Sequence, residues 1–101
     1  MAVKSTNESF PQDIAQGLVL ADFYSDSCIP CKRMSPVLAE LEEENPGVKL
    51  VKLNINFGAD TAAKYEVTSV PTLVFFKDGS EVQRITGTVK KAQIEEILKT
   101  L

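Results

Sequence analysis

Along the first half of the chain, the spacing of hydrophobic residues changes from the continuous run of a buried strand to the period of a helix face. A near-continuous apolar run at residues 18–24 is typical of a central strand that is covered on both faces. Apolar residues then recur with the spacing of one helix face, which predicts a helix over residues 31–44. Before the run, Ser9 is a suitable N-cap for a short helix near residues 10–16, and Gly17 is a suitable stop for it.

The second half of the chain predicts strands joined by a hairpin. Alternation over residues 49–54 indicates a strand, and a short helix is expected near residues 59–65. Residues 72–76 are rich in β-branched and aromatic side chains, which favour a further strand. The pair Asp78-Gly79 is typical of a hairpin turn, so residues 81–86 are expected to form the return strand.

The last residues and the order of the elements define the expected fold class. Residues 94–101 repeat the helical spacing and predict a C-terminal helix. Strand, helix and strand, followed by strand, hairpin, strand and helix, predict an α/β protein with a central mixed β-sheet flanked by α-helices on both faces. The chain has 101 residues without a repeat, linker or low-complexity tract. We therefore expect residues 1–101 to form a single domain.

Composition and charge exclude several classes of function. The net charge is −3, so the chain has no basic surplus with which to neutralise nucleic-acid phosphates. It has no histidine, which excludes Cys–His and Ser–His–Asp nucleophilic catalysis and any zinc site with a histidine ligand. No apolar stretch is long enough to span a membrane, and residues 1–9 lack the apolar core of a signal peptide. We therefore expect a cytoplasmic protein that binds neither nucleic acid nor membranes.

The candidate chemistry is the motif Cys28-Ile29-Pro30-Cys31, which lies between a predicted strand and a predicted helix. This context favours a redox function for the cysteine pair. Three alternatives stay open. A structural disulfide would close a very short loop and stabilise the fold by only roughly 2 kcal/mol. A zinc site would need two more ligands, and therefore a second copy of the chain. The spacing of two unrelated thiols could also be a coincidence.

The position of the motif gives the two cysteines different expected roles. Cys28 is expected in the turn before the helix, and Cys31 at the helix start. Unpaired N–H groups and a partial positive charge at a helix N-terminus favour the thiolate form of Cys28. A thiolate attacks a disulfide, and Cys31, one helical turn later, is close enough to attack in turn. Pro30 suits the first turn of a helix and stiffens the pair.

Asp22 interrupts the apolar run six residues before Cys28. On a central strand its carboxyl group would be desolvated and its pKa raised, which would make it a candidate proton relay for Cys31. An aspartate at a strand end, hydrogen-bonded to the backbone, is an equally good interpretation. Lys52 could be the charge partner of Asp22, although the alternation alone favours a solvated strand lysine.

Several motifs, in order and at compatible spacing over residues 9–101, resemble the thioredoxin family. They are Leu20-Ala21-Asp22-Phe23-Tyr24, Cys28-Ile29-Pro30-Cys31-Lys32, Pro36, Lys52-Leu53-Asn54-Ile55, Val70-Pro71-Thr72 and Gly87. The resemblance implies a thioredoxin fold and a protein-disulfide reductase. Such a protein cycles between a reduced dithiol and an intramolecular disulfide.

The resemblance also implies roles for individual residues. Cys28 would be the nucleophile and Cys31 the resolving thiol. Asp22 would be a buried base that acts through water, with Lys52 as its neighbour. Pro30 would tune the cysteine pair.

A substrate-binding surface follows from the same resemblance. Val70 and Pro71 would form a loop with a cis peptide bond, which would place the Val70 backbone beside Cys28. A substrate strand could pair with that backbone. Ile29 and Gly87 would border the same surface.

The implied partners are disulfide-containing target proteins and a separate reductase. That reductase would be a thioredoxin reductase, expected to be an NADPH-dependent flavoprotein, and it would restore the dithiol. No bound cofactor or metal is implied, because the Cys28–Cys31 disulfide is itself the redox group. The chain is expected to be a monomer.

The chain differs from the family pattern at Tyr24, Ser27 and Ile29, where tryptophan, tryptophan and glycine are typical. Two other functions stay open beside the reductase. The surface around Ile29, Val70 and Pro71 could belong to a peptide-binding module, or the cysteine pair could serve an oxidant or isomerase.

The acidic residues Glu40 and 42–44 oppose the helix dipole and are interpreted as a solvated face, with a docking patch for a basic partner as the minority interpretation.

Overall fold

The computed structural model describes residues 2–101 and contains every strand and helix that the pattern predicts. One strand, β1, is not predicted, because two residues are too few to show an alternation. The elements in chain order are β1 (Val3–Lys4), α1 (Phe10–Asp13), β2 (Leu18–Tyr24), α2 (Ile29–Glu44), β3 (Val48–Asn54), α3 (Ala59–Lys64), β4 (Thr72–Lys77), β5 (Ser80–Thr86) and α4 (Lys91–Leu98).

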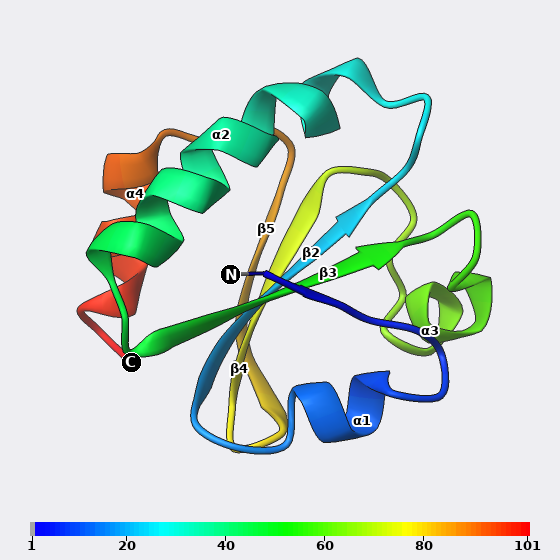
Figure 1. Cartoon of the computed structure of the whole chain (residues 1–101), viewed down its shortest axis with the longest axis horizontal. Coiled ribbons are helices and arrows are strands. Elements are labelled where there is room, and N and C mark those ends of the chain that lie inside the picture. The colour runs from blue at the N-terminus through cyan, green and yellow to red at the C-terminus, as the bar shows by residue number, and fades with distance from the viewer. Residues whose placement is uncertain (1) are drawn as a thin grey trace.

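The five strands form one mixed sheet in the order β1-β3-β2-β4-β5. β1, β3 and β2 run parallel to one another, whereas β4 and β5 are antiparallel to their neighbours. Figure 1 shows α2 and α4 on one side of this sheet and α1 and α3 on the other. The expected α/β architecture, a central mixed sheet with helices on both faces, is therefore confirmed.

The alternation of side chains along β2 divides the core into two layers. Val19 and Phe23 point into the cluster beneath α1 and α3, whereas Leu20 points into the cluster beneath α2 and α4. Both faces of β2 are therefore buried, as its continuous apolar pattern predicts. Asp22 lies an even number of residues from Leu20 and so faces α2, the helix that carries the cysteines.

The first helix is shorter than predicted. α1 ends at Asp13 rather than at residue 16, because the chain turns at Gly17, whose φ is +72°. Ser9 occupies the N-cap position, but its side chain makes no capping bond and donates to Asp13 instead. A four-residue helix is not stable by itself. Burial of Phe10 against other aromatic rings anchors it, a contribution of about 2–3 kcal/mol.

The predicted hairpin turn is confirmed. Asp78 and Gly79 both have positive φ, 49° and 88°, which suits the tight turn between β4 and β5. β5 is an edge strand, and its register against β4 shifts between Phe75 and Phe76. On β5 the Arg84 guanidinium pairs with Glu81 at 2.8 Å. This end of the sheet is remote in sequence from the cysteine motif and serves to hold β4 in place.

The C-terminal helix also ends earlier than its apolar spacing predicts. α4 ends at Leu98, and Leu101 lies beyond it in a turn closed by a bond from its N–H to the Leu98 carbonyl. Leu101 nevertheless packs against the cluster beneath α2 and α4. The spacing therefore identified a buried face correctly but not the last helical residue.

Candidate active site

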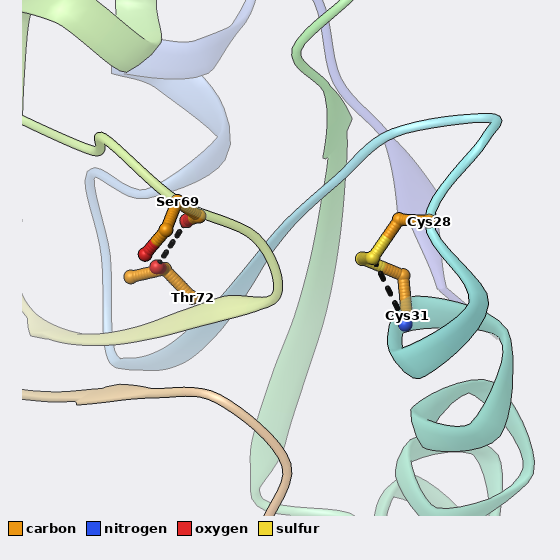
Figure 2. The surroundings of a disulfide bond; sticks show 4 residues. All are labelled: Cys28, Cys31, Ser69 and Thr72. Carbon is orange, nitrogen blue, oxygen red and sulfur yellow. Dashed lines mark hydrogen bonds between the residues drawn. A yellow bond between two sulfur atoms is a disulfide. The ribbon is translucent and has the colours of Figure 1, made fainter.

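Cys28 and Cys31 form a disulfide at the start of α2, with their Cα atoms 5.2 Å apart (Figure 2). The helix begins at Ile29 and not at residue 31, so Cys28 is its N-cap and Pro30 lies in its first turn. Proline has a fixed φ and no N–H, and both properties fit a first helical turn. The helix therefore extends back through Pro30, which places Cys28 directly at the helix terminus.

The backbone of the first turn contacts one of the two sulfurs. The Cys31 N–H donates to the Cys28 Sγ at 3.1 Å, as a capping side chain would accept it. The N–H groups of a first turn have no partner within the helix and carry the positive end of the helix dipole. In the reduced protein, these groups favour negative charge on the Cys28 sulfur over the neutral thiol.

The exposure of the motif differs from residue to residue. Cys28 is 9% exposed and Cys31 5%, so Cys28 is the more accessible of the two. Ile29 between them is 61% exposed and is one of three exposed large hydrophobic side chains within residues 2–101. A partner that approaches the disulfide therefore meets Cys28 first, with an apolar side chain beside it.

Asp22 lies on β2 beneath α2 and is buried, with 2% of its surface exposed. Its Oδ1 atom has no hydrogen-bond partner within residues 2–101. Burial raises the pKa of Asp22 from 3.8 to about 6, and the positive charge of Lys52 partly opposes that rise. Asp22 is thus a desolvated carboxyl group in the middle of a strand rather than a hydrogen-bonded residue at a strand end.

Lys52 is the neighbour of Asp22 in the parallel pairing of β2 with β3. It does not form a direct ion pair with Asp22, and its charge acts on the carboxyl group from a distance. Its Nζ donates to the Ser35 Oγ at 3.4 Å and lies 5.1 Å from the centre of the Tyr24 ring. These two contacts hold the ammonium group beside the carboxyl group without neutralising it.

A cavity of about 150 Å³ joins Asp22 to Cys31. Because roughly 10–15 Å³ of such space holds one water molecule, several waters fit between the carboxyl group and the cysteine. We name this space the proton cavity. Its walls are formed by Asp22, Tyr24, Ser25, Asp26, Cys31, Lys32, Ser35 and Lys52.

The loop before β4 lies across from the cysteines. Figure 2 shows the disulfide on one side and the loop with Ser69 and Thr72 on the other. The Val70–Pro71 bond in this loop is cis, the geometry that the resemblance implies. The Thr72 hydroxyl donates to the Ser69 carbonyl at 2.7 Å, and the Gly87 N–H donates to the Pro71 carbonyl at 2.8 Å. Both bonds hold the loop in position at the end of the sheet.

Sequence reasoning did not identify Ser35 or Tyr24 as part of this site. Ser35 lies four residues after Cys31, so helical spacing places both on one face of α2. That signal was available, whereas the contact with Lys52 depends on how two side chains meet in the folded protein. Tyr24 ends β2 two residues after Asp22, and alternation puts both on the α2 face.

The described part of the chain offers neither a cluster of metal ligands nor a membrane-spanning helix. Within residues 2–101, no group of three or more His, Cys, Asp or Glu side chains is arranged to hold a metal ion. The helices of the same part of the chain are too short or too polar to cross a membrane.

Comparison with known proteins gives consistent matches over nearly the whole chain. The model of the thioredoxin family matches residues 1–100. The chain is 42% identical over 93 residues to the thioredoxin of Chlamydia pneumoniae, a match that covers 92% of this chain and 91% of that protein. It is 41% identical over 97 residues to the thioredoxin of Bacillus subtilis (strain 168), covering 95% and 93%. The thioredoxin of Staphylococcus epidermidis (strain ATCC 12228 / FDA PCI 1200) is 42% identical over 97 residues.

Proposed function

The chain belongs to the thioredoxin family. From this premise we propose the role of each site residue in dithiol–disulfide exchange. The exchange itself runs through the Cys28–Cys31 pair, which is the redox group of this family. Family members need no further cofactor, and they act on disulfide-containing proteins and are themselves reduced by a reductase.

Cys28 is proposed as the nucleophile. Its thiolate attacks one sulfur of a target disulfide, so that a bond forms between Cys28 and the target while the target's other sulfur leaves as a thiolate and takes up a proton. The Cys31 N–H beside the Cys28 Sγ and the greater exposure of Cys28 support this assignment. Pro30, in the first turn, keeps the two sulfurs at the helix terminus.

Cys31 is proposed as the resolving thiol, with Asp22 as its base. Cys31 loses its proton through water in the proton cavity to the Asp22 carboxylate, and the new thiolate attacks the Cys28 Sγ. The mixed disulfide breaks, the Cys28–Cys31 disulfide forms, and the second target sulfur leaves reduced. A pKa of about 6 keeps most of Asp22 ionised near neutral pH while leaving it basic enough to accept a proton. Lys52 adjusts that pKa from a distance.

The substrate strand is proposed to lie along the Val70–Pro71 loop. Val70 is half-buried and lies two residues before β4, beyond the residues of that strand that pair with β2 and β5, so its backbone offers a place where another chain can add. Ile29 offers an apolar contact on the cysteine side of this loop. Gly87, bonded to the Pro71 carbonyl, borders the loop without a side chain that would obstruct the approach.

The physiological partner that returns the dithiol is proposed to be an NADPH-dependent flavoprotein reductase. A cytoplasmic location fits this role, because a reducing compartment keeps the cysteine pair available as an electron donor. We propose that the protein works as a monomer, which leaves the surface around Cys28 free for targets.

The single observation that carries these assignments is the bond from the Cys31 N–H to the Cys28 Sγ at a helix terminus. The test is the redox equilibrium of the pair with glutathione. We expect a potential well below the glutathione poise, as a reductant requires. A potential above it would identify an oxidant or isomerase. A disulfide that glutathione cannot reduce, and that dithiothreitol removes only on unfolding, would be a structural staple and would overturn the proposal.

A second variant separates catalysis from binding. Cys31→Ser is expected to accumulate mixed disulfides with target proteins through Cys28. If the Cys28→Ser, Cys31→Ser double variant still performed the protein's task, the cysteines would be incidental and the chain would be a peptide-binding module. Adducts recovered only through Cys31, in the Cys28→Ser variant, would reverse the two roles.

A further inference from the structure

A second cavity of about 280 Å³ adjoins the proton cavity. The two share Tyr24 and Lys52 as a common wall. This second cavity lies where β1 and β3 end, and the turn after β3 closes it. We name it the lysine–phenylalanine cavity, after Lys4, Lys52 and Phe57 in its lining. None of the steps of disulfide exchange described above uses it.

Two lysines from neighbouring strands line its wall. Lys4 on β1 and Lys52 on β3 are paired in register, so their side chains lie on the same face of the sheet. Two ammonium groups on the same face of a sheet carry like charges and repel each other. Within residues 2–101, neither ammonium group forms an ion pair with a carboxylate. A carboxylate from another molecule would relieve this repulsion.

The carboxyl groups nearby do not serve that purpose. Asp22 is buried beyond Lys52 in the neighbouring cavity and does not form a direct ion pair with it. Asp26 is engaged by Asn54, whose Nδ2 donates to its Oδ1 at 2.8 Å. Within the described residues, Lys4 and Lys52 are thus not paired directly with a carboxylate, and Asp22 acts on Lys52 from a distance.

Phe57 lies at the rim of the same cavity with 80% of its surface exposed, the largest fraction among the exposed large hydrophobic side chains that the structure describes. Its position does not result from a loose loop. The N–H groups of Phe57 and Gly58 both donate to the Asn54 carbonyl, at 3.1 and 2.9 Å. A Cβ at Gly58 would lie 2.7 Å from the Leu53 side chain, so the turn is packed closely against the core. The fold therefore holds an exposed aromatic ring at a cavity that Lys4 and Lys52 also line.

From this arrangement we propose that the lysine–phenylalanine cavity is a second docking site for disulfide targets, and that it receives an acidic side chain together with a neighbouring apolar one. The carboxylate lies between Lys4 and Lys52, and the apolar side chain packs on Phe57. Because the cavity shares a wall with the space behind Cys31, the acidic segment belongs to the chain that flanks the target disulfide. The inference rests on the proposed exchange function and adds a substrate class to it.

The test compares two short disulfide-bonded peptides that differ only beside one cysteine. One carries Glu-Phe at that place and the other Gln-Ser. The pre-reduced protein is mixed with each, and the second-order rate constants are measured. We expect the acidic peptide to react about fivefold faster at low ionic strength, the effect of one favourable charge contact with its apolar neighbour. Added salt is expected to reduce this preference.

Matched variants of the protein test whether the preference for the acidic peptide depends on Lys4 and Phe57. Lys4→Gln combined with Phe57→Ser is expected to abolish the preference while leaving the rate with the Gln-Ser peptide unchanged. The control combines Lys77→Gln with Val82→Ser, because these residues are also an exposed lysine and an exposed hydrophobic residue but lie at the hairpin end of the sheet. The control is expected to keep the preference.

A preference that is absent, or that survives the Lys4 and Phe57 substitutions, would overturn the docking proposal. If the wild type failed to reduce the Gln-Ser peptide as well, the exchange function itself would be in error, so the two failures are distinguishable. A second measurement does not depend on the double variant. A peptide with Glu-Phe and serine in place of cysteine is titrated into the Cys28→Ser protein, and amide shifts are expected at Phe57 and Gly58 but not at Val82.

Discussion

The two ends of α2 differ in how the groups placed there interact with the helix dipole. At its N-terminus, Cys28 caps the helix and accepts a bond from the Cys31 N–H, so the positive end of the dipole is directed at a sulfur atom. At its C-terminus the chain places carboxylates, Glu40 and residues 42–44, where the dipole disfavours negative charge. The arrangement at the N-terminus favours negative charge on the Cys28 sulfur. The carboxylates at the C-terminus are unfavourable there unless a positive charge lies nearby.

The compensation comes from another helix. The Lys91 Nζ of α4 donates to carboxylate oxygens of both Glu40 and Glu44, and these bonds raise the pKa of Lys91 and lower that of Glu40. The Leu41 carbonyl at the helix end accepts bonds from both the backbone N–H and the side-chain amide of Asn45. Glu40 and Glu44 of the acidic run are therefore tied to α4. The dipole at the N-terminus of α2 therefore acts on the Cys28 sulfur, whereas salt bridges at its C-terminus attach α2 to α4.

The largest effect is expected from a substitution at the reactive end. Cys28→Ser removes the attacking sulfur and should abolish reduction of a disulfide peptide, because serine is not ionised near neutral pH and forms no disulfide. The matched change at the other end, Glu44→Gln, should leave the rate within a factor of about two, since the carboxylate is remote from the sulfurs. Stopped-flow mixing of pre-reduced protein with the peptide measures both. Equal losses in the two variants would remove the distinction between the ends.

Asp22→Asn should change both rate and stability. Without the base, release of the mixed disulfide near neutral pH should slow by about 10²-fold, the low end of what a positioned general base contributes. The rise of the wild-type rate through a pH of about 6 should also disappear. Quenched-flow trapping of the mixed disulfide measures this step, and an unchanged rate would exclude Asp22 from the mechanism.

The same substitution should stabilise the fold at high pH. The folded-state pKa of Asp22 is raised, so the folded protein binds the proton more tightly than the unfolded chain, and its stability falls as pH rises from 3.8 towards 6. The asparagine variant avoids this loss and should gain up to about 3 kcal/mol above that range and little below it. Urea unfolding at several pH values measures the gain. A gain of the same size at low pH would point to a cause other than ionisation.

The activation of Cys28 should be visible in the reduced protein alone. At mildly acidic pH, iodoacetamide should alkylate Cys28 about tenfold faster than a free cysteine peptide, because more of it is thiolate. Cys31 should react more slowly, since it is the more buried of the two. Peptide mapping after brief labelling identifies the modified cysteine. Equal labelling of both would mean that the helix terminus does not distinguish them.

The smallest effect is expected at the acidic end. Lys91→Met should lower the melting temperature by only about 1–3 °C, because exposed ion pairs contribute little. The difference should shrink as salt is added, and the redox potential should stay unchanged. Differential scanning calorimetry with and without salt measures this effect. A shift in potential would show that the two ends of α2 are coupled.

The sequence predicts the parts of the molecule that depend on local chemistry. Asp78-Gly79 requires positive φ and occurs where both residues adopt it, and the apolar run before Tyr24 becomes a strand buried on both faces. The cysteine motif and its helix are likewise local. The starting residue of α2 was missed because helical spacing is visible in the apolar positions but not in the first turn, which is formed here by Ile29 and Pro30.

What the sequence could not decide depends on how separate elements pack. It left open whether Asp22 is desolvated within the sheet or hydrogen-bonded at a strand end, and its burial in the structure follows from α2, which covers that face. The alternation favoured a solvated Lys52 and only the family resemblance implied it as the neighbour of Asp22, whereas its contacts with Ser35 and Tyr24 follow from side-chain placement in three dimensions. The strand β1, which carries Lys4, was too short to leave a pattern.

The shape of β5 has a consequence for concentrated solutions. An outermost strand exposes a row of unpaired N–H and C=O groups, on which another molecule can nucleate fibrils. Here the register shift opposite Phe75 and Phe76 interrupts the regular ladder, and the paired charges of Glu81 and Arg84 lie along the same strand. Both features hinder the pairing of a strand from another molecule with the free edge of β5. The protein should therefore resist fibrillation from this side, and neutralising Glu81 and Arg84 together is the change most suited to removing that protection.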